Sequence, residues 1–339
     1  MSQTMRPRAA VKTSSLIAGL AAASLTLSAC AGEGSSIAGS GGELTELNVD
    51  YATYSVLSLV IKEHGWLEEE LGEDGVDVNW VFSAGSNRAN ESLRAQAVDF
   101  GTTGGGPALQ ARANGTQIKT VYVTHASEGF GLAVPEDSEI EDVEDLRGAS
   151  VAVTRGTDPY FFLLQTLDLF DVPVEEVTLE NLQHADGRAA LDNGTVDAWS
   201  GLDPILAGAE VAGARLIYTN PELISPIVLN VTEQFESEHP ETVQLVIDVY
   251  ERARQWVLDN PEEAQDIYAE EAGLEPEIAE LAFSRFNHDI SGVPVAEELS
   301  PVLETIGSFM VDSGDVRDQE ALDEALETLF EPSYAQAAE

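Results

Sequence analysis

The chain has 339 residues, of which 16 are lysine or arginine and 61 are aspartate or glutamate, so its formal net charge is −45. A phosphate backbone needs a basic footprint, and this balance therefore excludes nucleic acid as a partner. The acidic residues are scattered along the whole chain, which is typical of a protein that works in high salt, where self-repulsion is screened. We expect a halophilic or salt-tolerant source.

The N-terminus predicts an exported lipoprotein. Arg6, Arg8 and Lys12 form a positive region, residues 16–27 form a short apolar stretch, and Leu27-Ser28-Ala29-Cys30 follows. This tetrapeptide resembles the lipobox of bacterial lipoproteins, in which the cysteine is lipidated and becomes the first residue; the alternative is a plain signal peptide with an incidental cysteine. Residues 1–29 are then the signal peptide, and residues 30–42, rich in glycine and serine, form a flexible tether.

Strands and helices alternate from residue 44 onward. We expect strands over 44–51, 76–82 and 118–123 and helices over 56–64, 87–97 and 108–113. Between them, Val98 to Pro107 is an apolar run that ends in glycines, with a proline that opens a helix. Such a turn predicts bare N–H groups at a helix start, a favourable place for an anionic oxygen. The alternative is an ordinary tight turn.

A second α/β unit follows the polar break at 135–138, a candidate domain crossing. Its expected strands are 149–153, 177–181, 196–199 and 216–218, and its expected helices are 160–170, 186–191 and 205–212. The chain returns at 227–231 and is then mostly helical, over a helix that starts at Pro240 and over 275–286, 295–311 and 319–330. Asn260 reads as a helix N-cap, and 334–339 is expected to fray. This alternation predicts an α/β fold with mostly parallel sheet.

Several turns of the chain share one plan. Arg155 to Pro159 and Ser200 to Pro204 repeat the sequence of strand, small-residue turn, proline and helix, and Tyr51 to Tyr54 and Gly85-Ser86 are two more strand ends. Ligands of open α/β sheets bind outside the carboxyl ends of the strands, so these turns together predict a cleft lined by N–H groups and hydroxyls.

A family resemblance rests on motifs that run in order from about residue 44 to residue 264. They are Val98-Asp99-Phe100-Gly101 with Thr103-Gly104 and Pro107, Val134-Pro135-Glu136-Asp137-Ser138, Asp145-Leu146-Arg147-Gly148 with Val151-Ala152-Val153, Gly156-Thr157, Ala185-Asp186-Gly187-Arg188-Ala189-Ala190, Gly194-Thr195-Val196-Asp197-Ala198-Trp199, Asp203-Pro204, His239-Pro240-Glu241, and Asn260-Pro261-Glu262-Glu263-Ala264. Together they resemble the solute-binding proteins of ABC importers for aliphatic sulfonates, taurine and nitrate.

The resemblance implies a type II periplasmic-binding-protein-like fold, with two α/β lobes joined by hinge strands. Residues 43–132 and 225–339 form lobe I in this interpretation, and residues 133–224 form lobe II. The implied protein is a monomer anchored outside the cell membrane; it captures a small anion between its lobes, closes by a hinge and delivers the anion to a membrane permease, without a cofactor or a metal. The implied ligand-binding residues are Thr103, Gly104, Gly105, Gly106, Arg155, Thr157, Trp199 and Asp203, together with Tyr54 and Ser86.

The chain departs from the pattern of many sulfonate binders at two places. Gly105-Gly106 stands where they have Asp-Thr, so a hydroxyl that would meet the anion is missing, and Leu202 stands where they often have tryptophan before Asp-Pro. Arg155 is either a counter-charge for the anion or a surface arginine paired with an acid. Trp199 is either a pocket wall or a core aromatic.

Two other functions stay open at this point. The same fold could bind a thiamine or pyrimidine precursor, with Tyr51, Tyr54 and Trp199 stacking a ring. A pyrimidine-synthesis enzyme is the third reading, since a related family resembles one. The sequence has no Gly-x-Ser-x-Gly or His-Glu-x-x-His motif and no phosphate-binding Gly-Lys-Ser/Thr, and its five histidines lack metal-ligand spacing, so we expect a binding protein and not an enzyme.

Overall fold

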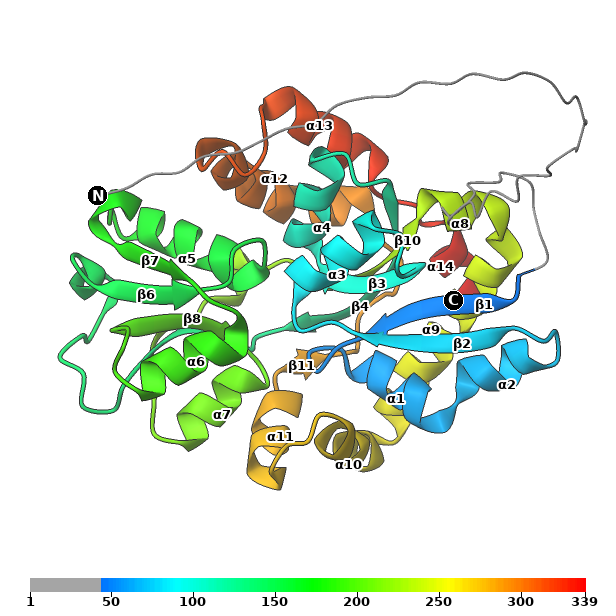
Figure 1. Ribbon diagram of the computed structural model, residues 1–339, viewed down its shortest axis with the longest axis horizontal. Coiled ribbons are helices and arrows are strands. Elements are labelled where there is room, and N and C mark those ends of the chain that lie inside the picture. Colours follow the sequence, from blue (N-terminus) through cyan, green and yellow to red (C-terminus); the bar gives the residue numbers. More distant parts are fainter. Residues whose placement is uncertain (1–43) are drawn as a thin grey trace, which may run out of the picture. The chain divides into compact units, whose positions relative to one another are not determined.

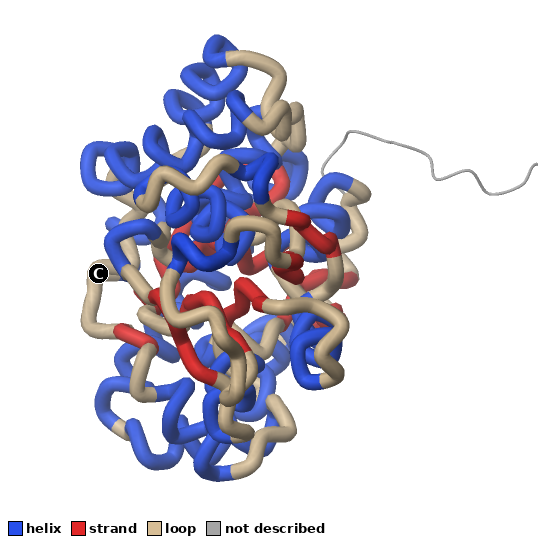
Figure 2. Tube along the Cα trace, turned by 90° about the vertical axis from the view of Figure 1, so that its left-hand side faces the viewer, coloured by secondary structure: helices blue, strands red, loops and turns tan. Residues whose placement is uncertain are grey.

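The computed structural model describes residues 44–339. The predicted signal peptide, Cys30 and the tether over 30–42 lie outside the described residues. The described chain forms two β-sheets with helices packed around each, which Figures 1 and 2 show from two directions. The predicted α/β class is confirmed. Within residues 44–339, no helix is both long and apolar enough to cross a membrane.

The first sheet has six strands in the order β11-β4-β10-β3-β1-β2. Its strands are β1 (Glu46–Tyr51), β2 (Asp77–Phe82), β3 (Phe100–Gly104), β4 (Ile118–Ser127), β10 (Ile227–Thr232) and β11 (Phe286–Asn287). Strand β1 is parallel to β2 and β3, whereas β10 is antiparallel to both β3 and β4. The sheet is therefore less parallel than expected, because β10 is a return strand from the second sheet and β11 pairs antiparallel at the edge.

The second sheet has five strands in the order β7-β6-β8-β5-β9. They are β5 (Phe130–Val134), β6 (Ser150–Val153), β7 (Thr178–Asn181), β8 (Ala198–Leu202) and β9 (Arg215–Tyr218). Strand β6 pairs parallel with β7 and β8, and β5 pairs antiparallel with β8 and β9. Residues 200–202, predicted as a turn, thus belong to β8, where they face β5.

We call the first sheet with its helices the first lobe, and the second sheet with its helices the second lobe. The chain passes from one sheet to the other between Ser127 and Phe130 and again between Tyr218 and Ile227. The sequence predicted these crossings at 132/133 and 224/225. The first crossing comes earlier in the structure, because the whole of β5 pairs within the second sheet. The polar break at 135–138 follows this crossing and does not form it.

The helices of the second lobe are α5 (Asp158–Leu169), α6 (His184–Asp192) and α7 (Ile205–Val211), with 3-10 turns at Val143–Leu146, Val174–Glu176 and Pro221–Leu223. The remaining helices are α1 (Val56–His64), α2 (Trp66–Gly72), α3 (Ser86–Arg94), α4 (Gly105–Ala113), α8 (Glu233–Glu238), α9 (Pro240–Asp259), α10 (Pro261–Glu271), α11 (Pro276–Phe283), α12 (Ala296–Asp312), α13 (Gln319–Thr328) and α14 (Ser333–Ala338). Helix α1 begins and ends where the sequence predicts, because Gly65 takes a left-handed conformation (φ 64°) that closes the helix.

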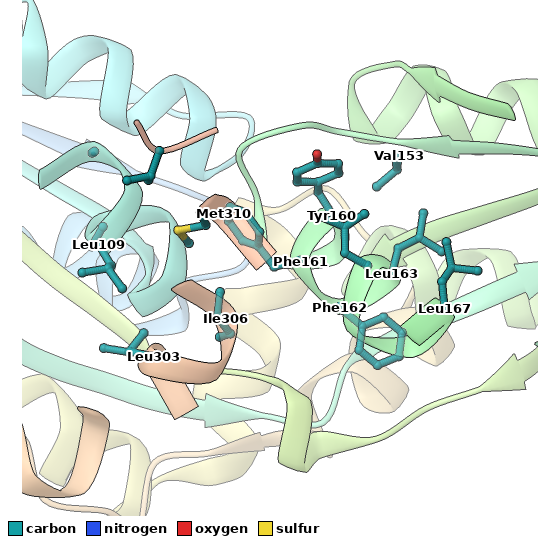
Figure 3. Packing of buried hydrophobic residues seen from close by; sticks show 14 of the residues in the cluster. Leu109, Val153, Tyr160, Phe161, Phe162, Leu163, Leu167, Leu303, Ile306 and Met310 are labelled. Carbon is teal, nitrogen blue, oxygen red and sulfur yellow. The ribbon is translucent and has the colours of Figure 1, made fainter. Parts of the chain in front are cut away.

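One apolar cluster joins the two lobes. Phe161 of α5 packs with Leu109 of α4 and with Ile306 and Met310 of α12, and all four side chains are buried. Figure 3 shows Phe161 pointing from its helix toward the side chains of α12. Helix α5 was predicted from its apolar composition alone; this contact explains why it is apolar on the side that faces the other lobe as well as toward its own sheet.

The C-terminal end and one helix cap differ from expectation. Residues 333–338 form α14, with Ala335 fully buried and the Tyr334 carbonyl accepting a hydrogen bond from Gln244 at 3.0 Å, so the end does not fray. This order comes from packing on α9, which the local sequence does not encode. Asn260 occupies the N-cap position of α10, as predicted, but it makes no side-chain capping hydrogen bond, and its amide donates to the Trp256 carbonyl at 2.9 Å.

Candidate functional site

The glycine turn between β3 and α4 lies at the junction of the lobes, but its N–H groups are not bare. Gly104 N donates to Ser86 Oγ at 3.1 Å, Gly105 N to the Pro226 carbonyl at 3.0 Å, and Gly106 N to Ser225 Oγ at 2.9 Å. The expectation of free donors in this turn is therefore wrong. The segment that precedes β10 lies across the turn and takes two of the three donors, a long-range contact that the local sequence does not show.

Asp158, the first residue of α5, comes to this turn from the second lobe. Its carboxylate lies so close to Gly104 that a Cβ on that glycine would be 1.8 Å from Asp158 Oδ2. Gly104 has an ordinary φ of −68°, so it is space and not backbone conformation that requires glycine here. Ser225 Oγ donates to Asp158 Oδ1 at 3.1 Å.

Burial dominates the electrostatics of the junction. It raises the pKa of Asp158 to about 7, although the hydrogen bond from Ser225 acts in the opposite direction. Asp50, at the end of β1, is fully buried and its pKa is likewise raised to about 7, while Thr102 N donates to its Oδ1 at 2.7 Å. No lysine or arginine of residues 44–339 makes an ion pair with either carboxylate.

Helix α3 begins at the same junction without a side-chain cap. Two polar atoms, His184 Nε2 of the second lobe and Asn87 Oδ1 of the first, would each lie 3.0 Å from a Cβ placed on Gly85, the residue before the helix. Both atoms are buried and neither has a hydrogen-bond partner. The lobes thus bring unpaired polar groups together over a helix N-terminus.

The hydrogen bonds of His184 define its tautomer. Thr154 Oγ1 donates to the Leu182 carbonyl at 2.7 Å and lies 3.2 Å from His184 Nδ1, so the hydroxyl accepts from an Nδ1–H group. Nε2 is then the unprotonated nitrogen. Burial lowers the pKa of His184 to about 4, which keeps the ring neutral at pH 7.

Six predicted residues meet at this junction: Tyr54, Ser86, Gly104, Gly105, Gly106 and Thr157. The Tyr54 hydroxyl donates to the Thr102 carbonyl at 2.8 Å, and Thr157, the residue before α5, donates to the Thr154 carbonyl at 2.6 Å. Thr103 turns to the other face of β3, where its hydroxyl accepts from Asn230 Nδ2 at 2.9 Å. Its ligand-binding role remains a prediction.

Arg155 points out of the junction along its edge. Its guanidinium lies 3.3 Å from Asp315 Oδ1, in the link between α12 and α13, and stacks over the ring of Tyr160. The side chain is 52% exposed. Of the two roles that the sequence left open, this geometry favours pairing with an acid, and the pair connects the second lobe to the C-terminal helices.

Trp199 occupies the core of the second lobe. Its ring is fully buried with Leu191 and Leu206, between the sheet and helices α6 and α7. A Cβ on Gly187 or Gly201 would collide with the indole at 2.9 Å and 2.3 Å, so both glycines make room for it. The position favours the alternative of a core aromatic.

Asp203 holds the lobes together at the opposite edge. Its buried carboxylate accepts from Ala207 N at 2.8 Å and lies 3.4 Å from Arg285 Nη1, which also pairs with Glu210 at 2.7 Å. Burial raises the pKa of Asp203 to about 6, and the positive charge of Arg285 partly opposes that rise.

Sequence reasoning missed four residues of the junction: Asn87, Asp158, His184 and Ser225. Asp158 lies in the turn from Arg155 to Pro159, directly before the proline that opens an apolar helix. An acidic residue in a turn that is expected to meet an anion could have indicated a special role. His184 had no such signal. Among the described residues, no group of three or more His, Cys, Asp or Glu side chains could hold a metal ion.

The chain is similar to known proteins over much of its length. The family described as NMT1/THI5 like matches residues 52–264. A protein of Bacillus subtilis (strain 168) named for aliphatic sulfonate binding is 28% identical over 265 residues, which are 77% of this chain and 79% of that protein.

Solved structures show the fold. The alkanesulfonate-binding protein SsuA from Xanthomonas axonopodis pv. citri, solved with MOPS, matches with a TM-score of 0.76 at 21% identity over 84% of this chain and 98% of its own. A Candida albicans gene product with the generic periplasmic binding protein fold has a TM-score of 0.68 at 14% identity over 85% and 96%. The desulfurization enzyme DSZB has a TM-score of 0.63 at 17% identity over 86% and 98%. The fold of this chain is that of periplasmic binding proteins.

Proposed function

Since the chain belongs to the NMT1/THI5-like family, we propose that it is the extracytoplasmic solute-binding component of an ABC importer. It captures a small organic anion, of the sulfonate class, between its two lobes and delivers it to a membrane permease. The names of its relatives and the fold it shares with SsuA support this role. Taurine and other aliphatic sulfonates are the first ligands to test, with nitrate as a smaller alternative.

One observation carries the proposal: unpaired polar atoms from both lobes converge at the start of α3. Buried polar groups normally have partners, and leaving one unpaired costs about 1–3 kcal/mol. Asn87 and His184 break that rule at one place, where the two lobes meet. Both atoms are acceptors, so an N–H or O–H donor elsewhere on the solute would supply the missing partners.

The start of α3 also suits an acidic group. The first N–H groups of a helix have no partner within it, and no side chain caps this one. The helix dipole adds a partial positive charge there. The sulfonate of a ligand would therefore lie at Ser86 and Asn87, beside Gly104.

A thermal-shift screen in high salt tests the proposal with taurine, alkanesulfonates, nitrate and thiamine precursors. Ligand at 100 times its Kd stabilises a protein by about 2.7 kcal/mol, which a melting curve detects easily. We expect a sulfonate to raise the melting temperature and Asn87→Ala to reduce that rise. Asn193→Ala, at an exposed asparagine after α6, is the control. Stabilisation by ring compounds alone would refute the anion.

A ring-shaped ligand has less support. Tyr51 packs against Trp80 and Phe82 at the edge of the first sheet, and Trp199 lies in the core of the second lobe. Only Tyr54 of the proposed stacking set is at the junction. Binding, and not turnover, is our proposal, and incubation with the best sulfonate should return it unchanged, although DSZB shares the fold.

We also propose a monomer anchored to the membrane by a lipid on Cys30. The lipobox Leu27-Ser28-Ala29-Cys30 supports the anchor, since a lipidated cysteine holds a protein at the membrane without a spanning helix. Cys30→Ser should release the protein into the soluble extracytoplasmic fraction. Unchanged membrane attachment would remove the anchor from the proposal.

A further inference from the structure

We propose that the Asp158 carboxylate binds a protonated amine on the ligand, so that the solute is a zwitterion and not a simple anion. This inference rests on the proposed function and narrows its ligand class. It concerns a residue that lies where the lobes meet and that no part of the proposed anion site requires.

The Asp158 carboxylate does not itself occupy an anion site at the glycine turn. The three N–H groups of Gly104 to Gly106 donate to Ser86, Pro226 and Ser225, and none donates to the Asp158 carboxylate. The carboxylate receives one side-chain hydrogen bond, from Ser225. It is therefore a buried acid that the protein itself supplies with few donors.

The charges around Asp158 point in the same direction. Tyr54 of the first lobe is a titratable neighbour of Asp158, and it supplies no positive charge. Arg155, three residues earlier, turns away to Asp315. An alkanesulfonate would bring a second negative charge beside this carboxylate with no cation to offset it. An aminosulfonate would bring its own cation.

The unpaired atoms of the junction also favour a ligand rich in N–H donors. Nε2 of His184 is a lone-pair acceptor in the tautomer defined above, and Asn87 Oδ1 is an acceptor as well. An ammonium group has three donors and no acceptor. It can pair with Asp158 and still donate to one of these atoms, while the sulfonate lies at the start of α3.

Two ligands that differ only in the amine test the proposal: taurine and ethanesulfonate, titrated calorimetrically into the protein in high salt. We expect the wild type to bind taurine at least roughly tenfold more tightly, the factor that one well-placed ionic hydrogen bond provides. Asp158→Asn keeps the side-chain volume and removes the charge, so the preference should disappear. Asp168→Asn, at an exposed position on the same helix, should keep it.

A second measurement does not depend on a variant that folds. The ratio of the taurine affinity to the ethanesulfonate affinity of the wild type should fall as the pH decreases from 8 to 5.5, because Asp158 becomes protonated. Burial lowers the pKa of His184 to about 4, so that ring stays neutral over this pH interval and does not change the ratio. A ratio that is constant with pH would overturn the assignment.

Other outcomes separate the two proposals. Equal or tighter binding of ethanesulfonate by the wild type, or a taurine preference that survives in Asp158→Asn, would show that Asp158 does not bind the amine of the ligand. If the wild type binds neither sulfonate, the sulfonate function fails, and β-alanine and propionate become the matched pair. A preference for β-alanine that Asp158→Asn abolishes would support the role of Asp158, and its absence would overturn it.

Discussion

Gly104 and Asp158 constrain each other at the junction of the lobes. The carboxylate approaches the glycine so closely that no side chain fits between them, and the two residues belong to different sheets. Burial without a counter-charge makes Asp158 a destabilising feature of the folded protein once it is ionised. Such a feature is typical of a functional position.

Gly104→Ala should lower the free energy of unfolding by about 1–3 kcal/mol, the usual effect of overpacking a tight site. The backbone already has a φ that alanine accepts, so the loss comes from the collision with Asp158. Denaturant unfolding measures it. In an Asp158→Ala background the loss should shrink, and Gly72→Ala, where a Cβ meets nothing within 4 Å, is the control. Equal losses in both backgrounds would contradict this explanation.

Asp158→Asn should stabilise the protein at high pH and not at low pH. The folded-state pKa is raised from 3.8 to about 7, so the unfolded chain ionises first and stability is lost as the pH rises through this interval. The variant stays neutral and avoids the loss. We expect a gain of roughly 2–4 kcal/mol at pH 8 that vanishes near pH 4. Asp168→Asn should show no such trend, and a gain that is independent of pH would show another cause.

Helices α5, α4 and α12 form the contact that holds the lobes together through apolar side chains. Phe161 lies at its centre, and Arg155 with Asp315 forms a polar pair at its edge. The pair is half exposed and therefore contributes little, about 0–1 kcal/mol, so most of the contact energy is apolar. In the hinge motion that we propose, opening of the lobes would expose this apolar surface.

Phe161→Ala should reduce the free energy of unfolding by about 3–5 kcal/mol, because the removed ring leaves a cavity against α12. Leu169→Ala, on the same helix but 57% exposed, should change it by less than about 0.5 kcal/mol. Thermal and denaturant unfolding of the wild type and the two variants measure these changes in the free energy of unfolding. A small effect at Phe161 would mean that the lobes are not joined by this packing.

The charge of the whole molecule is its most unusual property. A chain with 61 acidic and 16 basic residues repels itself at low ionic strength, and the screening length falls from about 10 Å at 0.1 M salt to about 3 Å at 1 M. The ion pairs of the described chain use most of its few cations, so the remaining acids depend on salt. Stability should therefore be a function of ionic strength.

The melting temperature should rise by several degrees, roughly 3–6 °C, between 0.1 and 2 M NaCl, as a gain of about 1–2 kcal/mol implies for a chain of this size. Differential scanning calorimetry measures this shift. Sucrose at matched osmolality is the control, since it stabilises by exclusion and not by screening. A melting temperature that does not respond to NaCl would contradict the halophilic interpretation.

Local patterns predicted most of the strands and helices, the limits of α1 and the position of the glycine turn, because periodicity, caps and stop signals act within about ten residues. The acidic surface likewise follows from composition alone. Helices α2 and α8 and strand β11 were not among the expected elements. Neither local patterns nor composition predicted the strand directions of β10 and β5 or the ordered helix α14, since these depend on packing between distant segments.

The chemistry of the junction was decided only by tertiary structure. Ser225 binds Gly106 across 119 positions of sequence, and Arg155 meets Asp315 across 160. These contacts occupied the N–H groups that looked free, turned Arg155 away from the site and brought Asp158 against Gly104. The sequence predicted a site at the strand ends, and the contact of the two lobes decides which polar groups of this candidate site are left without a partner.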